Sequence, residues 1–367
     1  MSKRVADRFP EGNAVVYCEQ AFGTTNGKTA HGLVRRTRRY QVTCVIDSAR
    51  DGQDAGEVLD RRPSGIPIVA NLAAAVAQAE RAGTPATHFV VGLAPDGGRL
   101  AGADRACVLQ AIAAGLHVDC GLHDFLSEDR EIAAAAEEMG VRIRDIRKPP
   151  PRSELHFFSG KIEEVQSTRI ALLGTDSAVG KRTTAWVLVD GLEKRGVSAV
   201  MAGTGQTAWL QGAAYSFILD STVNDFVSGE IEHMVWSAWN DLKPDVIVLE
   251  GQGSLMNPAY PGGFELLAAG RPSFVILQHA PARQEYDGFP GFPMHPLPEQ
   301  IRAIEMISGR PVVAITVNHE GLRPEDVPAV CAGIRKETGL PAHDVLLEGA
   351  GPLVESLAPH LGGVASR

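Results

Sequence analysis

The stretch IALLGTDSAVGKRTT (residues 170–184) carries an apolar, strand-like run into a glycine-containing turn that opens a helix. This order is typical of a phosphate-binding loop, in which backbone N–H groups and a lysine hold phosphate oxygens. The usual spacing is G-x-x-x-x-G-K-[ST], and here Gly174 and Gly180 stand one residue further apart. Arg182 follows Lys181 where the usual loop has its Mg²⁺-binding hydroxyl. The sequence therefore predicts a phosphate-binding loop whose metal ligand is displaced.

The arginine after the lysine bears on the kind of ligand. A guanidinium cannot ligate a cation, but it can hold a phosphate through two hydrogen bonds. Arg182 therefore favours a phosphate ligand bound without Mg²⁺, such as coenzyme A or a dinucleotide. The alternative is a Mg²⁺-nucleoside triphosphate, with Thr183 reaching the metal in a loop reshaped by its extra residue. The candidate ligand-binding residues here are Thr175, Asp176, Ser177, Ala178, Val179, Gly180, Lys181, Arg182, Thr183 and Thr184.

Two further stretches are expected at the same site. VLEGQGSL (248–255) puts Glu250 at the end of a predicted strand, where an acid either serves Mg²⁺ or stabilises a turn. AGTGQTAWL (202–210) follows a neighbouring strand and contributes Gln206 as a candidate ligand-binding residue. The carboxyl ends of strands in open α/β sheets bind ligands, so we expect both stretches to face the phosphate-binding loop.

The composition excludes several classes of protein. The chain has 367 residues and a net charge of −9, which argues against general nucleic-acid binding. Its five cysteines form no CxxC pair, as expected for reduced thiols in a cytoplasm. No apolar run approaches about 18 residues, so no membrane span is expected. The N-terminus, MSKRVADRFPEG, lacks the apolar segment of a signal peptide, so we expect a mobile arm and a cytoplasmic protein.

Strand-like and helix-like segments alternate along both halves, which predicts α/β domains with parallel sheets. The proline-rich segment KPPPRSELHFFSGK (148–161) interrupts the alternation, so we place a domain boundary there and expect domains at 1–150 and 151–367. The long segment 279–300 is expected to be functional or disordered. Strands are predicted at 13–20, 39–48, 65–70, 87–94, 116–121 and 141–146, and then at 168–174, 197–203, 244–251, 271–278 and 310–317.

The first domain holds a second glycine-lysine-threonine stretch, GTTNGKT (23–29), whose glycine spacing is too short for a phosphate-binding loop. We interpret it as a helix N-terminus that offers N–H groups and a lysine to an anion, such as a substrate carboxylate. The alternative is a capped turn with a solvated lysine. The candidate substrate-binding residues are Thr25, Asn26, Lys28 and Thr29, together with His123 at the end of another strand.

Asp47 ends the second predicted strand. An acid at that position of a dinucleotide-binding fold holds an adenosine ribose, but the accompanying G-x-G-x-x-G motif is absent here. A structural turn is the other interpretation. We expect no metal site, because His117, Cys120 and His123 lie on a strand that runs into a loop and cannot converge on one ion. The basic run Arg35, Arg36, Arg38 and Arg39 fits a solvated helix face, a phosphate contact or a subunit contact.

Seven motifs in one order carry a resemblance to a known family. GTDSAVGK alone is similar to the phosphate-binding loop of dethiobiotin synthetases. The whole set resembles the domain-of-unknown-function 1611 family. The motifs are VIDSARDGQDAGE, GLHDFLSED, GTDSAVGKRTTA, AGTGQTAWLQG, DSTVNDFVSGEIE, EGQGSLMNPAYPGG and GFPGFPMHPLPE.

The resemblance implies an N-terminal Rossmann-like domain followed by a P-loop NTPase-like α/β domain. Members of the family include bacterial D-glutamate N-acetyltransferases, which use acetyl-CoA and work beside a racemase of the N-acetyl product. It therefore implies an enzyme that acetylates a small-molecule substrate, an acidic amino acid expected to be D-glutamate, with Asp47 as general base or ammonium anchor. We also expect a homo-oligomer, a dimer. The alternatives are a Mg²⁺-ATP-dependent ligase or kinase of the dethiobiotin synthetase type, and a non-catalytic protein that senses a nucleotide or coenzyme A.

Overall fold

The computed structural model describes residues 9–361, so the N-terminal arm predicted from the sequence lies largely outside the described residues. The chain divides into two compact units. The first ends at Pro150 and also takes in Gln206–Gly212, and the second comprises Pro151–Gly205 and the chain from Ala213 onward. The sequence placed residues 206–212 in the C-terminal domain, and the structure corrects this.

The first unit is built on a six-stranded sheet in the order β3-β2-β1-β4-β5-β6, in which every pair of neighbours is parallel. This is the order of a Rossmann-like domain, and the six strands predicted in the first half of the sequence are all present. The strands are β1 (Gly12–Tyr17), β2 (Tyr40–Ile46), β3 (Ile68–Val69), β4 (His88–Val91), β5 (His117–Cys120) and β6 (Ile143–Asp145).

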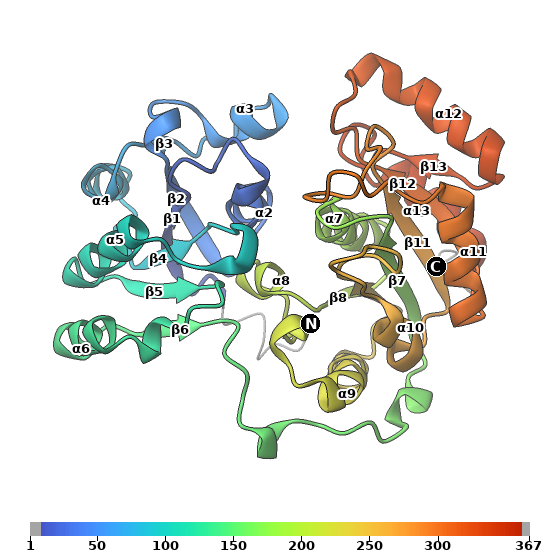
Figure 1. Ribbon diagram of the computed structural model, residues 1–367, viewed down its shortest axis with the longest axis horizontal. Coiled ribbons are helices and arrows are strands. Elements are labelled where there is room, and N and C mark those ends of the chain that lie inside the picture. The colour runs from blue at the N-terminus through green and yellow to red at the C-terminus, as the bar shows by residue number, and fades with distance from the viewer. Residues whose placement is uncertain (1–8, 362–367) are drawn as a thin grey trace. The chain divides into compact units, whose positions relative to one another are not determined.

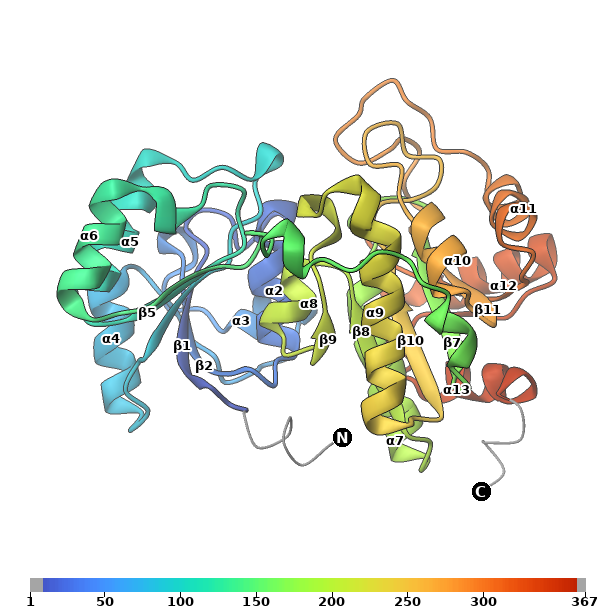
Figure 2. The same cartoon turned by 90° about the horizontal axis from the view of Figure 1, so that it is seen from below.

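Helices cover both faces of this sheet (Figures 1 and 2). In both views α4, α5 and α6 lie on one side, and α2, α3 and α8 on the other. Side-chain caps fix where two of them begin: Asn71 accepts a hydrogen bond from the backbone N–H of Ala74, and Asp129 accepts from those of Glu131 and Ile132. The helices are α2 (Lys28–Arg35), α3 (Ala55–Asp60), α4 (Leu72–Arg81), α5 (Gly102–Ala113), α6 (Arg130–Met139) and α8 (Gln206–Leu210).

The short helix α8 comes from the middle of the sequence but packs into the first unit. Leu210 is fully buried in the core of that unit. The guanidinium of Arg39 lies 3.6 Å from the centre of the Trp209 ring and donates a hydrogen bond to the Trp209 carbonyl. Gln211 donates hydrogen bonds to the carbonyls of Gly32 and Arg36. Burial of apolar side chains and satisfied polar groups together explain why this segment packs into the first unit, although the residues before and after it belong to the second.

The second unit has a seven-stranded sheet in the order β13-β12-β11-β7-β10-β8-β9, and its neighbouring strands are again parallel. Its five longer strands match those predicted for the second half. The strands are β7 (Thr168–Gly174), β8 (Ala199–Gly203), β9 (Tyr215–Ser216), β10 (Val246–Glu250), β11 (Phe274–His279), β12 (Val312–Val317) and β13 (Ala342–His343).

Helices α9, α10, α11 and α12 contribute buried residues to one hydrophobic cluster of the second unit, while α7 packs on β8 and β10 and contacts α13. The segment 279–300, expected to be functional or disordered, runs as an ordered loop into α11. The helices are α7 (Lys181–Lys194), α9 (Asn224–Leu242), α10 (Phe264–Gly270), α11 (Leu297–Ser308), α12 (Val327–Thr338) and α13 (Gly351–Leu357).

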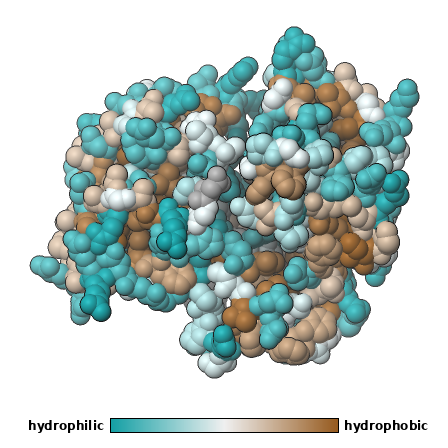
Figure 3. Space-filling model, in the orientation of Figure 1, coloured by the Kyte–Doolittle hydropathy of each residue, from teal (hydrophilic) through white to brown (hydrophobic). Residues whose placement is uncertain are grey.

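Hydrophobic and hydrophilic residues are interspersed over the face of the molecule seen in Figure 3. Among the residues that the structure describes, no helix combines the length and the apolar character needed to cross a bilayer.

Candidate functional site

The phosphate-binding loop predicted from the sequence connects β7 to α7 at the carboxyl edge of the second sheet. A Cβ atom on Gly174 would lie 2.8 Å from Lys181 Nζ, so only glycine leaves room for the lysine to fold back over the loop. Gly180, at the N-cap of α7, has φ +98°, which favours glycine, and offers no side chain to the first N–H groups of the helix. These N–H groups and the helix dipole can therefore hold an anion.

The lysine of the loop is buried and bridges two segments of the site. Its Nζ donates hydrogen bonds of 2.8 Å to the carbonyl oxygens of Asp176 and Gly253. Gly253 belongs to the loop after β10, so the ammonium ties the phosphate-binding loop to the end of the neighbouring strand. An ammonium in this position adds a charge-assisted contact for a phosphate.

The far end of the loop is fastened to β11 and β12. Thr184, only 2% exposed, donates a 2.6 Å hydrogen bond to Gln278 Oε1, which also accepts from Thr316. Because its hydroxyl is used inside the protein, Thr184 serves the fold rather than a ligand.

The near end of the loop contacts a histidine of β11. The Thr175 hydroxyl pairs with His279 Nδ1 at 3.0 Å. Burial lowers the pKa of His279 to about 4, so this imidazole is neutral at pH 7.

Asp176 is the centre of a buried network that the sequence did not predict. Its side chain has no exposed surface and forms an ion pair with Arg283 at 2.9 Å. Its carboxylate also accepts hydrogen bonds from the Asn257 amide and from the backbone N–H of Asp287 and Ser177. With these donors around it, Asp176 shapes the loop, and the 279–300 loop is part of the same site.

Glu250 stands at the end of β10, beside the phosphate-binding loop, and is 6% exposed. Within residues 9–361, its Oε2 atom and the Ser254 hydroxyl are buried and form no hydrogen bond with the protein. Burial raises the pKa of the Glu250 carboxyl, while the positive charges of Arg182 and Lys181 act in the opposite direction. The site therefore places a buried carboxyl beside two cations, with one oxygen ready to bind a ligand or a proton.

Gln206, predicted to join this site, is the first residue of α8 and belongs to the first unit. There its side chain lies against Gly121, where a Cβ atom would approach Gln206 Cγ to 2.8 Å. Its neighbour Thr204 stays in the second unit and donates a hydrogen bond to the Glu250 carbonyl. The structure thus brings Glu250 and Thr204 to the phosphate-binding loop, and Gln206 as a ligand-binding residue stays a prediction.

The predicted substrate residues of the first unit follow β1 and β5 at the carboxyl edge of that sheet. Thr25 and Asn26 lie in a short 3₁₀ turn, and the exposed Lys28 opens α2. His123 is also exposed, and its backbone N–H donates to the Gly98 carbonyl. Thr29 differs from them, because it is 1% exposed and its hydroxyl pairs with that of Thr207. That hydroxyl holds α8 in place and is not offered to a substrate.

Asp47 caps the turn that follows β2. It is 1% exposed, and its two oxygens accept hydrogen bonds of 3.0 Å from the backbone N–H groups of Gln20, Phe22 and Ala49. A carboxylate so occupied joins the loop after β1 to the end of β2. The geometry favours the structural interpretation, and a catalytic role for Asp47 stays a prediction.

The other first-unit groups have separate environments. His117 Nδ1 accepts a hydrogen bond from the backbone N–H of Arg142, and Cys120 is buried in β5. No cluster of three or more His, Cys, Asp or Glu suited to a metal ion occurs among residues 9–361. In the basic run, Arg35 forms an ion pair with Asp60, whereas Arg39 is 6% exposed against Trp209. The prediction that the basic run forms a solvated helix face is therefore wrong for Arg39.

A histidine–aspartate pair at the ends of β12 and β13 was also missed. His319 Nδ1 lies 2.6 Å from Asp344 Oδ2, and the side chain of the adjacent Asn318 donates to the carbonyl of Val179 in the phosphate-binding loop. The sequence holds only a weak indication of this pair: NHEG directly follows a predicted strand, where ligand-binding residues of such sheets are found.

Comparison with known proteins covers both units. Residues 156–354 match the family model described as "Domain of unknown function (DUF1611_C) P-loop domain", and residues 48–149 match that described as "Domain of unknown function (DUF1611_N) Rossmann-like domain". The crystal structure of a DUF1611 family protein from Anabaena variabilis is similar, with a TM-score of 0.85 and 29% identity, covering 95% of this chain and 99% of that one.

Two curated relatives carry a functional name. A "D-glutamate N-acetyltransferase" from Tritonibacter scottomollicae is 31% identical over 280 residues, which are 74% of this chain and 81% of the relative. A second "D-glutamate N-acetyltransferase", from a Pseudoalteromonas species, is 28% identical over 289 residues, covering 76% of this chain and 83% of the relative.

Proposed function

The chain belongs to the DUF1611 family, and on that premise we propose that it transfers an acetyl group from acetyl-CoA to the amino group of an acidic amino acid. The named relatives support an N-acetyltransferase, and D-glutamate is the substrate their names suggest. The observation that carries the proposal in this chain is the pair of cations, Lys181 and Arg182, beside the buried Glu250.

The two cations suit a donor whose phosphates are held but not transferred. In a loop that handles Mg²⁺-nucleotides, the hydroxyl after the lysine and an acid on a neighbouring strand serve the metal. Here Arg182 takes the place of that hydroxyl, and its positive charge acts on Glu250, the acid at the end of the neighbouring strand. We infer that the guanidinium supplies the charge that Mg²⁺ supplies elsewhere, so that coenzyme A phosphates bind to α7 and Lys181 without metal.

Acetyl transfer requires that the amine be deprotonated before it attacks. The amine nitrogen then forms a bond to the thioester carbonyl carbon, the C–S bond breaks, and the sulfur leaves as a thiolate. The nitrogen loses a proton as the amide forms, and the thiolate takes up a proton to give the free thiol. Glu250 is a better candidate for the base than Asp47, because one of its oxygens has no partner in the described protein and its pKa is raised by burial. The oxygens of Asp47 are both used by backbone N–H groups.

We propose that the carboxylate of the amino-acid substrate binds at the carboxyl edge of the first sheet. Lys28 and the N-terminus of α2 are suited to a carboxylate, and His123 is exposed at the end of β5. The proposal includes a homodimer, and the family resemblance adds a racemase of the N-acetyl product as its functional partner.

Thiol release from acetyl-CoA tests the proposal. The purified protein is given acetyl-CoA with D-glutamate, L-glutamate or D-aspartate, each with Mg²⁺ and with EDTA. We expect release that depends on the amino acid and not on Mg²⁺. Absence of release with every acidic amino acid would contradict the proposal, and Mg²⁺-dependent ATP hydrolysis in its place would favour a ligase or kinase.

A further inference from the structure

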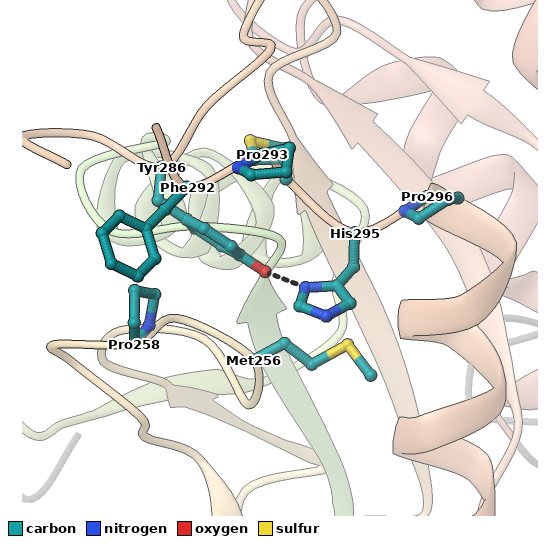
Figure 4. A pocket seen from close by; sticks show the side chains of 8 residues that line it. Met256, Pro258, Tyr286, Phe292, Pro293, His295 and Pro296 are labelled. Atoms are coloured by element: carbon teal, nitrogen blue, oxygen red, sulfur yellow. Dashed lines mark hydrogen bonds between the residues drawn. The ribbon is translucent and has the colours of Figure 1, made fainter. Parts of the chain in front are cut away.

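A pocket of 340 Å³ lies in the second unit between the loop after β10 and the 279–300 loop (Figure 4). Met256 and Pro258 line it from the first loop. Tyr286, Phe292 and His295 line it from the second loop, which ends where α11 begins. None of these residues has a role in the site described so far.

Both walls of the pocket are fastened to the phosphate-binding loop. Asn257, which stands between Met256 and Pro258, donates a 2.8 Å hydrogen bond to the Asp176 carboxylate. The backbone N–H of Asp287, the residue after Tyr286, donates to the other oxygen of the same carboxylate at 2.9 Å. Asp176 therefore links both walls of the pocket to the phosphate-binding loop, which places the pocket near a ligand that the loop holds.

The lining is apolar except at one point. The Tyr286 hydroxyl lies 2.8 Å from His295 Nδ1, and the two side chains point toward each other in Figure 4. Tyr286 is 3% exposed, and burial raises the pKa of its phenol, which stays protonated at neutral pH. Mostly apolar walls with a single polar pair suit a ligand that is largely hydrocarbon and carries carbonyl groups.

The size and the rim of the pocket agree with this chemistry. Small-molecule pockets range from about 300 to 1,000 Å³, so this one suits an arm of a ligand rather than a whole nucleotide carrier. Exposed aromatic rings stand next to it: Phe292 is 53% exposed and packs on Phe289, which in turn contacts Tyr260. Exposed aromatic groups beside a pocket are typical of a surface that a ligand covers.

We propose that this pocket binds the acyl-thioester arm of a phosphorylated acyl carrier, the pantetheine end of acetyl-CoA, while the carrier's phosphates lie on the phosphate-binding loop. The arm supplies hydrocarbon for Met256 and Phe292 and carbonyl groups for the Tyr286–His295 pair. This inference rests on the proposed function, because a nucleoside triphosphate has no such arm.

Binding of two ligands tests the inference. Acetyl-CoA carries the pantetheine arm. Adenosine 3′,5′-bisphosphate has phosphates of the coenzyme A nucleotide but lacks the arm. We expect Met256→Trp, which fills the pocket, to weaken acetyl-CoA binding about ten-fold by calorimetry and to leave the bisphosphate unchanged. Met306→Trp is the matched control, because Met306 is 82% exposed on α11 of the same unit.

Phe292→Ala gives a second variant with little risk to folding, since its ring is half-exposed. It should weaken acetyl-CoA binding about three-fold and again spare the bisphosphate. Unchanged acetyl-CoA binding in both variants would overturn the pocket assignment, as would an equal loss for both ligands. Measurements of turnover separate the pocket assignment from the proposed function. If the protein releases thiol but the pocket variants bind acetyl-CoA as the wild type does, only the pocket assignment is refuted. If the variants lose acetyl-CoA binding selectively but the protein releases no thiol, only the proposed acetyltransferase activity is refuted.

Discussion

Asp176 and Arg283, 107 residues apart in the sequence, form an ion pair of 2.9 Å in which the carboxylate is fully buried. The pair joins the phosphate-binding loop to the 279–300 loop. Since the carboxylate also anchors Asn257 and Asp287, a single charge organises three segments of the site.

Arg283→Met should lower the free energy of unfolding by about 3–5 kcal/mol, because it leaves the Asp176 charge buried without its partner. Urea denaturation measures the loss. Arg195→Met is the control: its partner Glu355 is 71% exposed, so about 1 kcal/mol or less should be lost. Equal effects of the two substitutions would show that Asp176 does not depend on Arg283.

Much of this fold is predictable from the sequence because each strand and helix is defined locally. The run 168–174 and the glycine turn after it predicted β7 and the start of α7. The partners of Asp176 were not predictable in this way, because Asn257 and Asp287 lie 81 and 111 residues away in the chain. Hydrogen bonds over such separations leave no periodic pattern in a single sequence.

Two site residues show how tertiary context overrides a local prediction. Gln206 follows β8 directly, as predicted, yet apolar burial of Leu210 and the contacts of Trp209 draw its helix into the first unit. Asp47 ends β2 as predicted, but the three N–H groups that occupy it come largely from the loop after β1. A sequence places an acid at a strand end, and only the structure says which donors surround it.

Arg182→Thr restores the usual glycine-lysine-threonine order and tests the role of the second cation. Charge-assisted hydrogen bonds contribute about 1.5–3 kcal/mol, so acetyl-CoA binding should weaken by about ten- to a hundred-fold. Calorimetry with Mg²⁺ and with EDTA measures both the affinity and any new dependence on metal. Arg182→Lys keeps the charge and should lose less. If Arg182→Thr binds acetyl-CoA as tightly as the wild type, Arg182 is not a phosphate ligand.

Asp47→Asn separates a structural role from a catalytic one. The amide replaces one acceptor oxygen with an NH₂ group that faces a backbone donor, so the free energy of unfolding should fall by about 1–3 kcal/mol. Asp51→Asn, at an exposed position nearby, is the control and should change little. A loss of kcat with unchanged stability would instead support Asp47 as the base.

Glu250→Gln should reduce kcat about a hundred-fold and leave acetyl-CoA binding intact, if its carboxylate takes the proton of the amine. Because burial raises the pKa of Glu250, kcat of the wild type should rise with pH as the carboxyl ionises, and the variant should lack this limb. Stopped-flow or steady-state profiles of kcat against pH measure it. Glu337→Gln, exposed on α12, is the control. A Glu250→Gln variant with full kcat would remove Glu250 from the mechanism.

His279 should make stability depend on pH between about 6.5 and 4. Burial lowers its pKa from 6.5 to about 4, so between these values the unfolded chain binds a proton that the folded protein does not. Stability from this group is therefore complete above about pH 6.5 and falls as the pH drops, by on the order of 3 kcal/mol in all.

The difference between wild type and His279→Asn isolates this contribution, because other groups that titrate in the same range are common to both proteins. Asparagine can still meet the Thr175 hydroxyl, which lies 3.0 Å from the imidazole Nδ1, but it does not titrate. Urea midpoints at pH 7.5, 6.5, 5.5 and 4.5 should fall more steeply for the wild type. Parallel curves would mean that His279 takes up its proton equally in the folded and unfolded states, and that the buried Thr175–His279 contact does not hold the imidazole neutral.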